Sequence, residues 1–183
     1  MNVSNQKILI VDDIEDNRFT LERRLSRSGY TAISQADCGK KALELVKEKS
    51  FDLILLDLMM PDISGLEVLK ILKADPKNRS IPVVMVTAAD EIETTAECIS
   101  NGADDYITKP INATLLKARV TACLEKKRFR DSEESYLSKV EADKKRTQTL
   151  LKQVLPEKVA EELNSSGLVR PRKYDDIAIL VCD

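Results

Sequence analysis

The first 110 residues alternate between short apolar runs and longer amphipathic segments, and this alternation limits the possible folds more than any other feature. The apolar runs are KILIVDD, YTAISQA, FDLILLD, IPVVMVTA and DYITKP. Segments with helical periodicity, such as SGLEVLKILKAD, lie between them. Strands that alternate with helices predict βαβ units and a parallel sheet. The runs Ile8–Val11, Leu53–Leu56 and Val83–Val86 are apolar on both faces, which is typical of strands covered by helices on both sides.

The segment after Pro110 is free of helix breakers. Residues 111–155 contain neither Gly nor Pro, so we expect a long helix that begins near residue 112. Counting this helix as the fifth gives a (βα)₅ arrangement. Gly29 and Gly102 fit the position just beyond a helix, where the chain commonly turns with a positive φ.

Composition excludes several classes of site. The chain has no histidine, which rules out a Ser-His-Asp triad, a His-ligated zinc site and a phosphohistidine on this chain. A net charge of −2 provides no overall basic surface for nucleic acid, and no apolar run approaches the roughly 18 residues that span a bilayer. The four cysteines form no Cys-x-x-Cys pair and are expected to be reduced thiols of a cytoplasmic protein.

Polar residues follow four of the apolar runs. They are Asp12 and Asp13 after the first run, then Asp57, Thr87 and Lys109. Ligands of open parallel sheets bind beyond the carboxyl ends of the strands, so these side chains are expected to share one crevice. Three carboxylates there would repel each other unless a cation neutralised them. A set of ligands that are all oxygens suits Mg²⁺.

The same residues could transfer a phosphoryl group. A carboxylate can attack phosphorus and form an aspartyl phosphate, and this reaction depends mainly on positioning and charge neutralisation. The Lys109 ammonium and the Thr87 hydroxyl could hold the phosphoryl oxygens opposite the metal. The crevice is therefore predicted to be a phosphoacceptor site in which one aspartate attacks and two bind the cation.

The motifs IVDDxxxNR, ILLDLMMPDISGLEVL, VTA and GADDYITKP resemble the receiver domain of two-component response regulators. The resemblance covers roughly residues 5–125, with the motifs in the expected order at the expected strand ends. It implies a flavodoxin-like, doubly wound α/β sheet with strand order 2-1-3-4-5. It also implies a cognate sensor histidine kinase or phosphotransfer protein as the partner.

The resemblance assigns a role to each candidate residue. Asp57 is the phosphorylated residue, and the protein ligands of Mg²⁺ are Asp12, Asp13, Asp57 and the backbone carbonyl of Met59. The remaining assignments are Thr87 and Lys109 as contacts of the phosphoryl group, Tyr106 as an aromatic switch, and Pro110 as the second residue of a cis peptide bond.

The charged part of the long helix has a partial coiled-coil pattern. Six residues follow the alternating spacing of three and four that coiled coils show: Leu137, Val140, Lys144, Thr147, Leu151 and Val154. Two of them are polar, so a solvated surface helix or a disordered linker remains an alternative. We expect a parallel homodimer through residues 112–155.

The end of the chain, VLPEKVAEEL and then YDDIAILVCD after a loop, resembles the entry into a class III nucleotide cyclase domain. The resemblance implies that Asp183 occupies a metal-binding position at the end of a strand, Asp176–Cys182. Pro156 fits the first position of a short helix in this segment. The alternative is that Val154–Leu163 is an ordinary amphipathic helix and 177–182 an ordinary strand. The expected organisation is a receiver domain at 1–125, a helical or coiled-coil linker at 126–155 and the start of a cyclase domain at 156–183.

Two functions therefore remain open. In the first, phosphorylation of the receiver controls a nucleotide cyclase, although this chain lacks the second metal aspartate and the purine-reading residues that a working cyclase needs. In the second, the receiver acts by protein–protein contact and dimerisation without an enzymatic effector. A DNA-binding regulator is the third hypothesis, but no helix-turn-helix pattern supports it.

Overall fold

The computed structural model describes residues 5–88, 92–154, 159–160, 162–163 and 167–168. Within these ranges, five strands alternate with five helices, as the sequence predicts. In chain order they are β1 (Lys7–Val11), α1 (Glu15–Arg27), β2 (Ala32–Ala36), α2 (Gly39–Glu48), β3 (Leu53–Asp57), α3 (Gly65–Ala74), β4 (Val83–Thr87), α4 (Ile92–Ser100), β5 (Asp105–Thr108) and α5 (Ala113–Val154). The chain forms two compact units, residues 1–131 and 132–183.

The five strands form one parallel sheet in the order β2-β1-β3-β4-β5. This arrangement confirms the flavodoxin-like topology predicted above. In register, Val11 pairs with Leu56, and Thr87 pairs with Thr108. Neighbouring strands therefore end at nearly the same height in the sheet. The predicted site residues, which follow these strand ends, lie together at one edge of the sheet.

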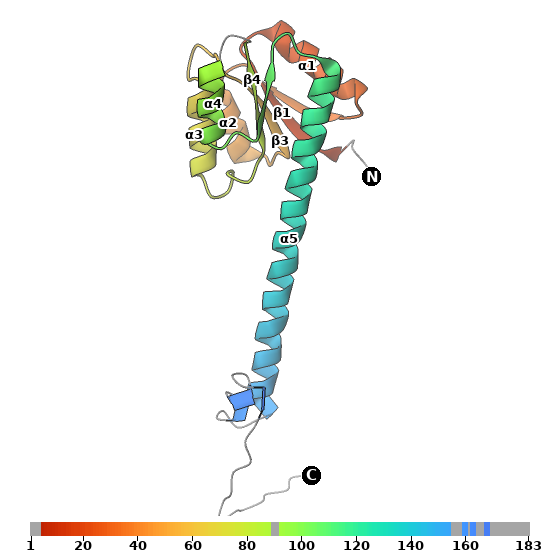
Figure 1. Ribbon diagram of the computed structural model, residues 1–183, viewed down its shortest axis with the longest axis vertical. Helices are drawn as coiled ribbons and strands as arrows, with labels where there is room; N and C mark the ends of the chain where they lie inside the picture. Colours follow the sequence, from red (N-terminus) through yellow and green to blue (C-terminus); the bar gives the residue numbers. More distant parts are fainter. Residues whose placement is uncertain (1–4, 89–91, 155–158, 161, 164–166, 169–183) are drawn as a thin grey trace, which may run out of the picture. The chain divides into compact units, whose positions relative to one another are not determined.

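The two faces of the sheet are covered by different helices (Figure 1), as the doubly apolar strands predict. Successive strand residues point to opposite faces, and each face has its own hydrophobic core. One core joins Leu9, Leu56 and Met85 to buried side chains of α2, α3 and α4, among them Val46, Leu69 and Cys98. The other joins Ile8, Leu55 and Val84 to α1 and the start of α5, with Leu21, Leu25, Leu116 and Val120.

Glycines shape three of the connections. Gly29 and Gly102 have φ values of +95° and +96° and end α1 and α4, as predicted. Gly65 meets a different requirement, since a Cβ there would lie 2.1 Å from the backbone oxygen of Asp57. No larger side chain fits at that distance, so Gly65 allows α3 to begin directly against the strand that carries Asp57.

An acidic residue in the β3–α3 loop holds the start of α2. The backbone N–H groups of Gly39 and Lys40 donate to the Asp62 carboxylate at 3.1 and 2.9 Å. Burial alone would raise the pKa of Asp62, but the backbone hydrogen bonds outweigh it and lower the pKa to about 2. The contact caps α2 and fixes the loop that follows Asp57.

The first part of α5 is anchored to the domain by apolar and then by basic side chains. After the buried Leu124, four basic residues contact groups that lie just before four of the strands. The contacts are Lys126 to Asp104 at 3.8 Å, Lys127 to Asp52 at 3.5 Å, Arg128 to the side-chain amide of Gln6 at 2.6 Å, and Arg130 to the backbone oxygen of Ser80. These contacts place α5 against the amino ends of β1, β3, β4 and β5.

Several expectations fall on residues outside the described ranges. Pro156, the strand Asp176–Cys182 and Asp183 are among them. Among the helices that the structure does describe, none combines the length and the apolar character that a membrane span requires.

Candidate functional site

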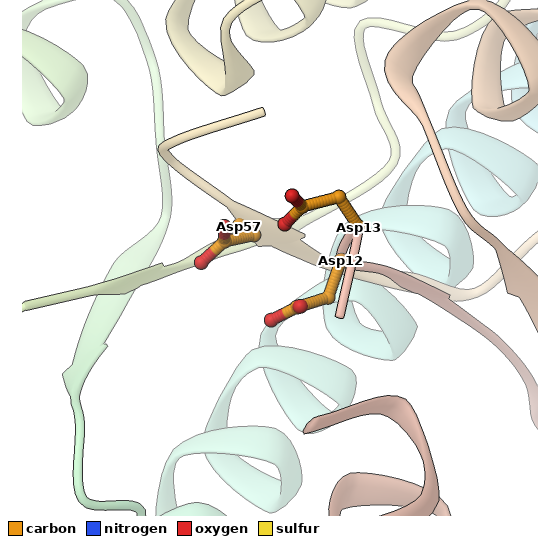
Figure 2. A group of neighbouring side chains, drawn as sticks. All are labelled: Asp12, Asp13 and Asp57. Carbon is orange, nitrogen blue, oxygen red and sulfur yellow. The ribbon is translucent and has the colours of Figure 1, made fainter. Parts of the chain in front are cut away.

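Three aspartates gather at the carboxyl ends of β1 and β3 (Figure 2). Each of Asp12, Asp13 and Asp57 offers a carboxylate oxygen, and these oxygens lie within 4.8 Å of one another. Asp12 and Asp57 are buried, with 0% and 4% of their surface exposed, whereas Asp13 is exposed. The structure thus brings together the three carboxylates that the strand ends predicted.

Lys109 lies between the two buried carboxylates. Its Nζ donates to Asp57 Oδ1 at 2.5 Å and to Asp12 Oδ2 at 3.0 Å. The residue follows β5, and its backbone N–H donates to the Thr87 carbonyl at 2.7 Å. The ammonium therefore neutralises part of the charge of the cluster.

Burial dominates the electrostatics of Asp57. It raises the pKa of this carboxyl to about 6, and the nearby Asp12 charge adds to the rise, while the hydrogen bond from Lys109 opposes it. For Lys109, burial alone would lower the pKa, but the hydrogen bonds to Asp57 and Asp12 outweigh it and raise the pKa. One cation therefore does not fully offset the cost of burying this carboxylate beside another.

Thr87 has an unused hydrogen-bonding group. The residue is 1% exposed, and within the described part of the chain its hydroxyl has no hydrogen-bond partner. Buried hydroxyls are normally paired, so an unpaired one at the carboxyl end of β4 is available to a bound group. Sequence analysis predicted this residue as a contact of a phosphoryl group.

The other predicted residues lie near the three aspartates in the fold but do not hydrogen-bond to their carboxylates in the described ranges. The Met59 side chain is 67% exposed, two positions beyond Asp57, and Tyr106 on β5 is 39% exposed. Within the described ranges, no hydrogen bond joins either residue to the three carboxylates. The bond between Lys109 and Pro110 is cis.

Sequence analysis gave no role to two residues that support the acid pair. The Asn17 amide donates to both carboxylate oxygens of Asp12 at 3.0 Å, and Arg18 donates to the backbone oxygens of Asp12 and Asp13. Both belong to the motif IVDDxxxNR. Asn17 follows Asp12 by five residues and lies on the first turn of α1. This spacing was the signal in the sequence that could have identified Asn17 as a support for Asp12.

The site has the ligand chemistry that suits Mg²⁺. Its donors are all oxygens, and at least one carboxylate is exposed, which leaves room for the waters that this ion usually keeps. A divalent cation would also stabilise the charged form of Asp57, whose pKa is raised mainly by burial and further by the nearby Asp12 charge. The residues present therefore fit the ion.

Residues 8–121 match the family described as the response regulator receiver domain. The chain belongs to this family. A solved response regulator structure from Chloroflexus aurantiacus is similar to the receiver domain with a TM-score of 0.63 and 30% identity, over 66% of this chain and 98% of the other. This likeness agrees with the strand order of the sheet.

Longer proteins also contain a similar receiver domain. A cyclic di-GMP phosphodiesterase of Thermotoga maritima is 38% identical over 155 residues, which cover 85% of this chain and 38% of that protein. The response regulator PleD of Caulobacter vibrioides is 44% identical over 114 residues, covering 62% of this chain and 25% of PleD. The chain therefore spans well under half the length of these curated relatives.

The raised pKa of Asp57 has a consequence for stability without metal. The folded-state pKa of about 6 lies above the usual aspartate pKa of about 3.9, so ionisation of Asp57 opposes folding as pH rises through this window. We expect Asp57→Asn to be more stable than the wild type by roughly 3 kcal/mol at pH 8 in a chelator, since one pKa unit corresponds to about 1.4 kcal/mol. Most of this difference should be lost by pH 4, where the Asp57 carboxyl of the folded protein is neutral.

Thermal unfolding from pH 4 to pH 8 measures this difference, and Mg²⁺ added at pH 8 should raise the melting temperature of the wild type more than that of the variant. Asp37→Asn is the control, because Asp37 follows β2 but is exposed and outside the cluster. A difference in stability between the wild type and Asp57→Asn that did not change with pH would contradict the conclusion that burial raises the pKa of Asp57.

Proposed function

We propose that the receiver domain accepts a phosphoryl group on Asp57 in a Mg²⁺-dependent reaction. The observation that carries the proposal is the convergence of three carboxylates, the Lys109 ammonium and an unpaired buried hydroxyl at one edge of the sheet. Asp57 is the acid closest to Lys109, and it ends the central strand between β1 and β4. The other two acids flank it and could complete the metal site together with the Met59 carbonyl.

The proposed reaction needs little covalent machinery. A carboxylate oxygen of Asp57 attacks the phosphorus atom, a new P–O bond forms, and the bond to the donor's leaving group breaks. Bound Mg²⁺ would neutralise phosphoryl oxygens on one side. Lys109 would turn from Asp12 and Asp57 toward the transferred group, and the Thr87 hydroxyl would donate to it.

The donor is a phosphohistidine on another protein or a small acyl phosphate. These 183 residues contain no histidine, and we propose that the phosphorylated histidine belongs to a partner, namely a sensor kinase or a phosphotransfer protein. Receiver domains interact with such proteins. Tyr106 on β5 and Pro110, which directly follows Lys109, are the residues we expect to change position on phosphorylation.

Labelling with acetyl phosphate tests the assignment. With Mg²⁺, the wild type and the control Asp37→Asn should each gain one phosphate by intact-mass spectrometry, and Asp57→Asn should gain none. Asp12→Asn and Asp13→Asn should be labelled more slowly because each removes a carboxylate of the metal site. Labelling of Asp57→Asn to the extent of the wild type would show that another residue is the acceptor.

We propose also that α5 pairs with the α5 helix of a second copy. Apolar side chains at the expected seam are exposed in the single chain, with 55% of Leu137 and 47% of Val140 accessible. The polar seam residue Thr147 donates its hydroxyl to the backbone oxygen of Asp143 at 2.9 Å. Because this hydroxyl is satisfied within its own helix, it is compatible with burial between two helices.

Sedimentation of the whole chain tests pairing. The wild type should sediment as a dimer at tens of micromolar, and Val140→Glu should shift it to the monomer because two like charges would face each other in the seam. Ser138→Glu adds the same charge away from the seam and should remain dimeric. A monomeric wild type would contradict the proposal, as would equal association of both variants.

The output that we propose for the full-length protein is a class III nucleotide cyclase. The support is the resemblance of residues from about 150 to Asp183, including a strand-like run that ends in an aspartate. The cyclic di-GMP phosphodiesterase among the relatives shows that similar receiver domains occur beside nucleotide enzymes. A receiver that acts only by protein contact through the exposed α5 seam is the alternative.

The gene beyond codon 183 distinguishes these outputs. For a cyclase we expect about 170 further residues, the size of one domain, with a second aspartate at a strand end. A frame that continued into a phosphodiesterase or a DNA-binding domain, or that stopped at once, would contradict the cyclase proposal. None of these results bears on phosphorylation of Asp57.

A further inference from the structure

The two neighbouring acids of the site differ in how they are held. The Asp12 carboxylate accepts hydrogen bonds from the backbone N–H of Ile14, from the Asn17 amide and from Lys109. By contrast, no residue in the described ranges donates to the Asp13 carboxylate. The direction of the Asp13 side chain therefore depends on the backbone that carries it.

That backbone is held by Arg18. The guanidinium Nη1 donates to the Asp12 carbonyl at 2.7 Å and to the Asp13 carbonyl at 3.1 Å. Its Nε donates to the Gln35 side-chain oxygen at 3.2 Å, and the Gln35 amide in turn donates to Glu22 at 2.6 Å. The guanidinium is thus fixed between the end of β1, the last part of β2 and α1.

The position of Arg18 explains how one side chain can restrain both acids. It lies on the first turn of α1, four residues after Ile14, and the Arg18 backbone N–H donates to the Ile14 carbonyl at 3.2 Å. Because the helix begins immediately after the acid pair, the planar guanidinium can reach two successive carbonyl groups. Hydrogen bonds from a charged donor are stronger than neutral ones, so these contacts limit rotation of the peptide unit between the acids.

We propose that Arg18 is a positioning residue for Mg²⁺, which acts by holding the backbone of Asp13 so that its carboxylate faces Asp57. This inference rests on the proposed metal site and names a residue outside its ligand set. Residues that orient metal ligands without touching the ion contribute substantially to metal affinity. Arg18 contacts the backbone of Asp13 and not its carboxylate. This leaves the carboxylate free to bind the ion.

Mg²⁺ titration followed by NMR tests the proposal without any phosphorylation. Arg18→Ala should raise the dissociation constant for Mg²⁺ about tenfold. Arg18→Lys should give an intermediate value, because an ammonium lacks the planar array of donors that spans both carbonyls and Gln35. Arg23→Ala is the control, since Arg23 is exposed on the same helix, and it should bind Mg²⁺ as the wild type does.

A double-mutant cycle separates positioning from a general loss of structure. In an Asp13→Asn background, Arg18→Ala should change the dissociation constant for Mg²⁺ less than twofold, because the carboxylate that it positions is gone. An equal tenfold loss in both backgrounds would overturn the proposal, and so would unchanged affinity of Arg18→Ala or of Arg18→Lys. A wild type that bound no Mg²⁺ would overturn the metal site as well, which distinguishes the two failures.

Discussion

The contact between Lys109 and two buried carboxylates is the interaction on which the site depends. Asp12 and Asp57 are almost fully removed from water, and Lys109 is within 3.0 Å of both. Burial nevertheless keeps the pKa of Asp57 raised, at about 6, so one cation does not fully offset the cost of burying this charged carboxylate beside another. Binding of a divalent cation would stabilise such a cluster of carboxylates. The proposed phosphoryl transfer depends on the same charged groups.

The fold supplies this arrangement through the ends of its strands. Parallel neighbours β1, β3, β4 and β5 deliver their last residues to one edge of the sheet, while separate cores on the two faces keep the strands in place. Gly65 lets α3 begin against Asp57, and basic residues of α5 contact the opposite ends of four strands. Helix α5, which we propose pairs with a second copy, is therefore attached to the same strands that form the site.

Much of this could be predicted from the sequence, because apolar runs and the polar residues that follow them are local features. The sheet order, the long helix and the five site positions Asp12, Asp13, Asp57, Thr87 and Lys109 came from such features and from the resemblance to receiver domains. The support by Asn17 and Arg18, and the cap that Asp62 places on α2, were missed because they depend on how segments approach each other in space. The contrast between buried Asp12 and exposed Asp13 has the same origin, since adjacent residues at a strand end can have opposite surroundings.

Titration of Asp57 by carbon-13 NMR tests the central claim most directly, because its carboxyl carbon reports the protonation state of that side chain alone. Without metal, we expect a midpoint near pH 6, and saturating Mg²⁺ should move it below the usual value of about 3.9 for aspartate. A midpoint near 3.9 that Mg²⁺ left unchanged would show that Asp57 is neither desolvated nor part of a metal site, and would contradict the account.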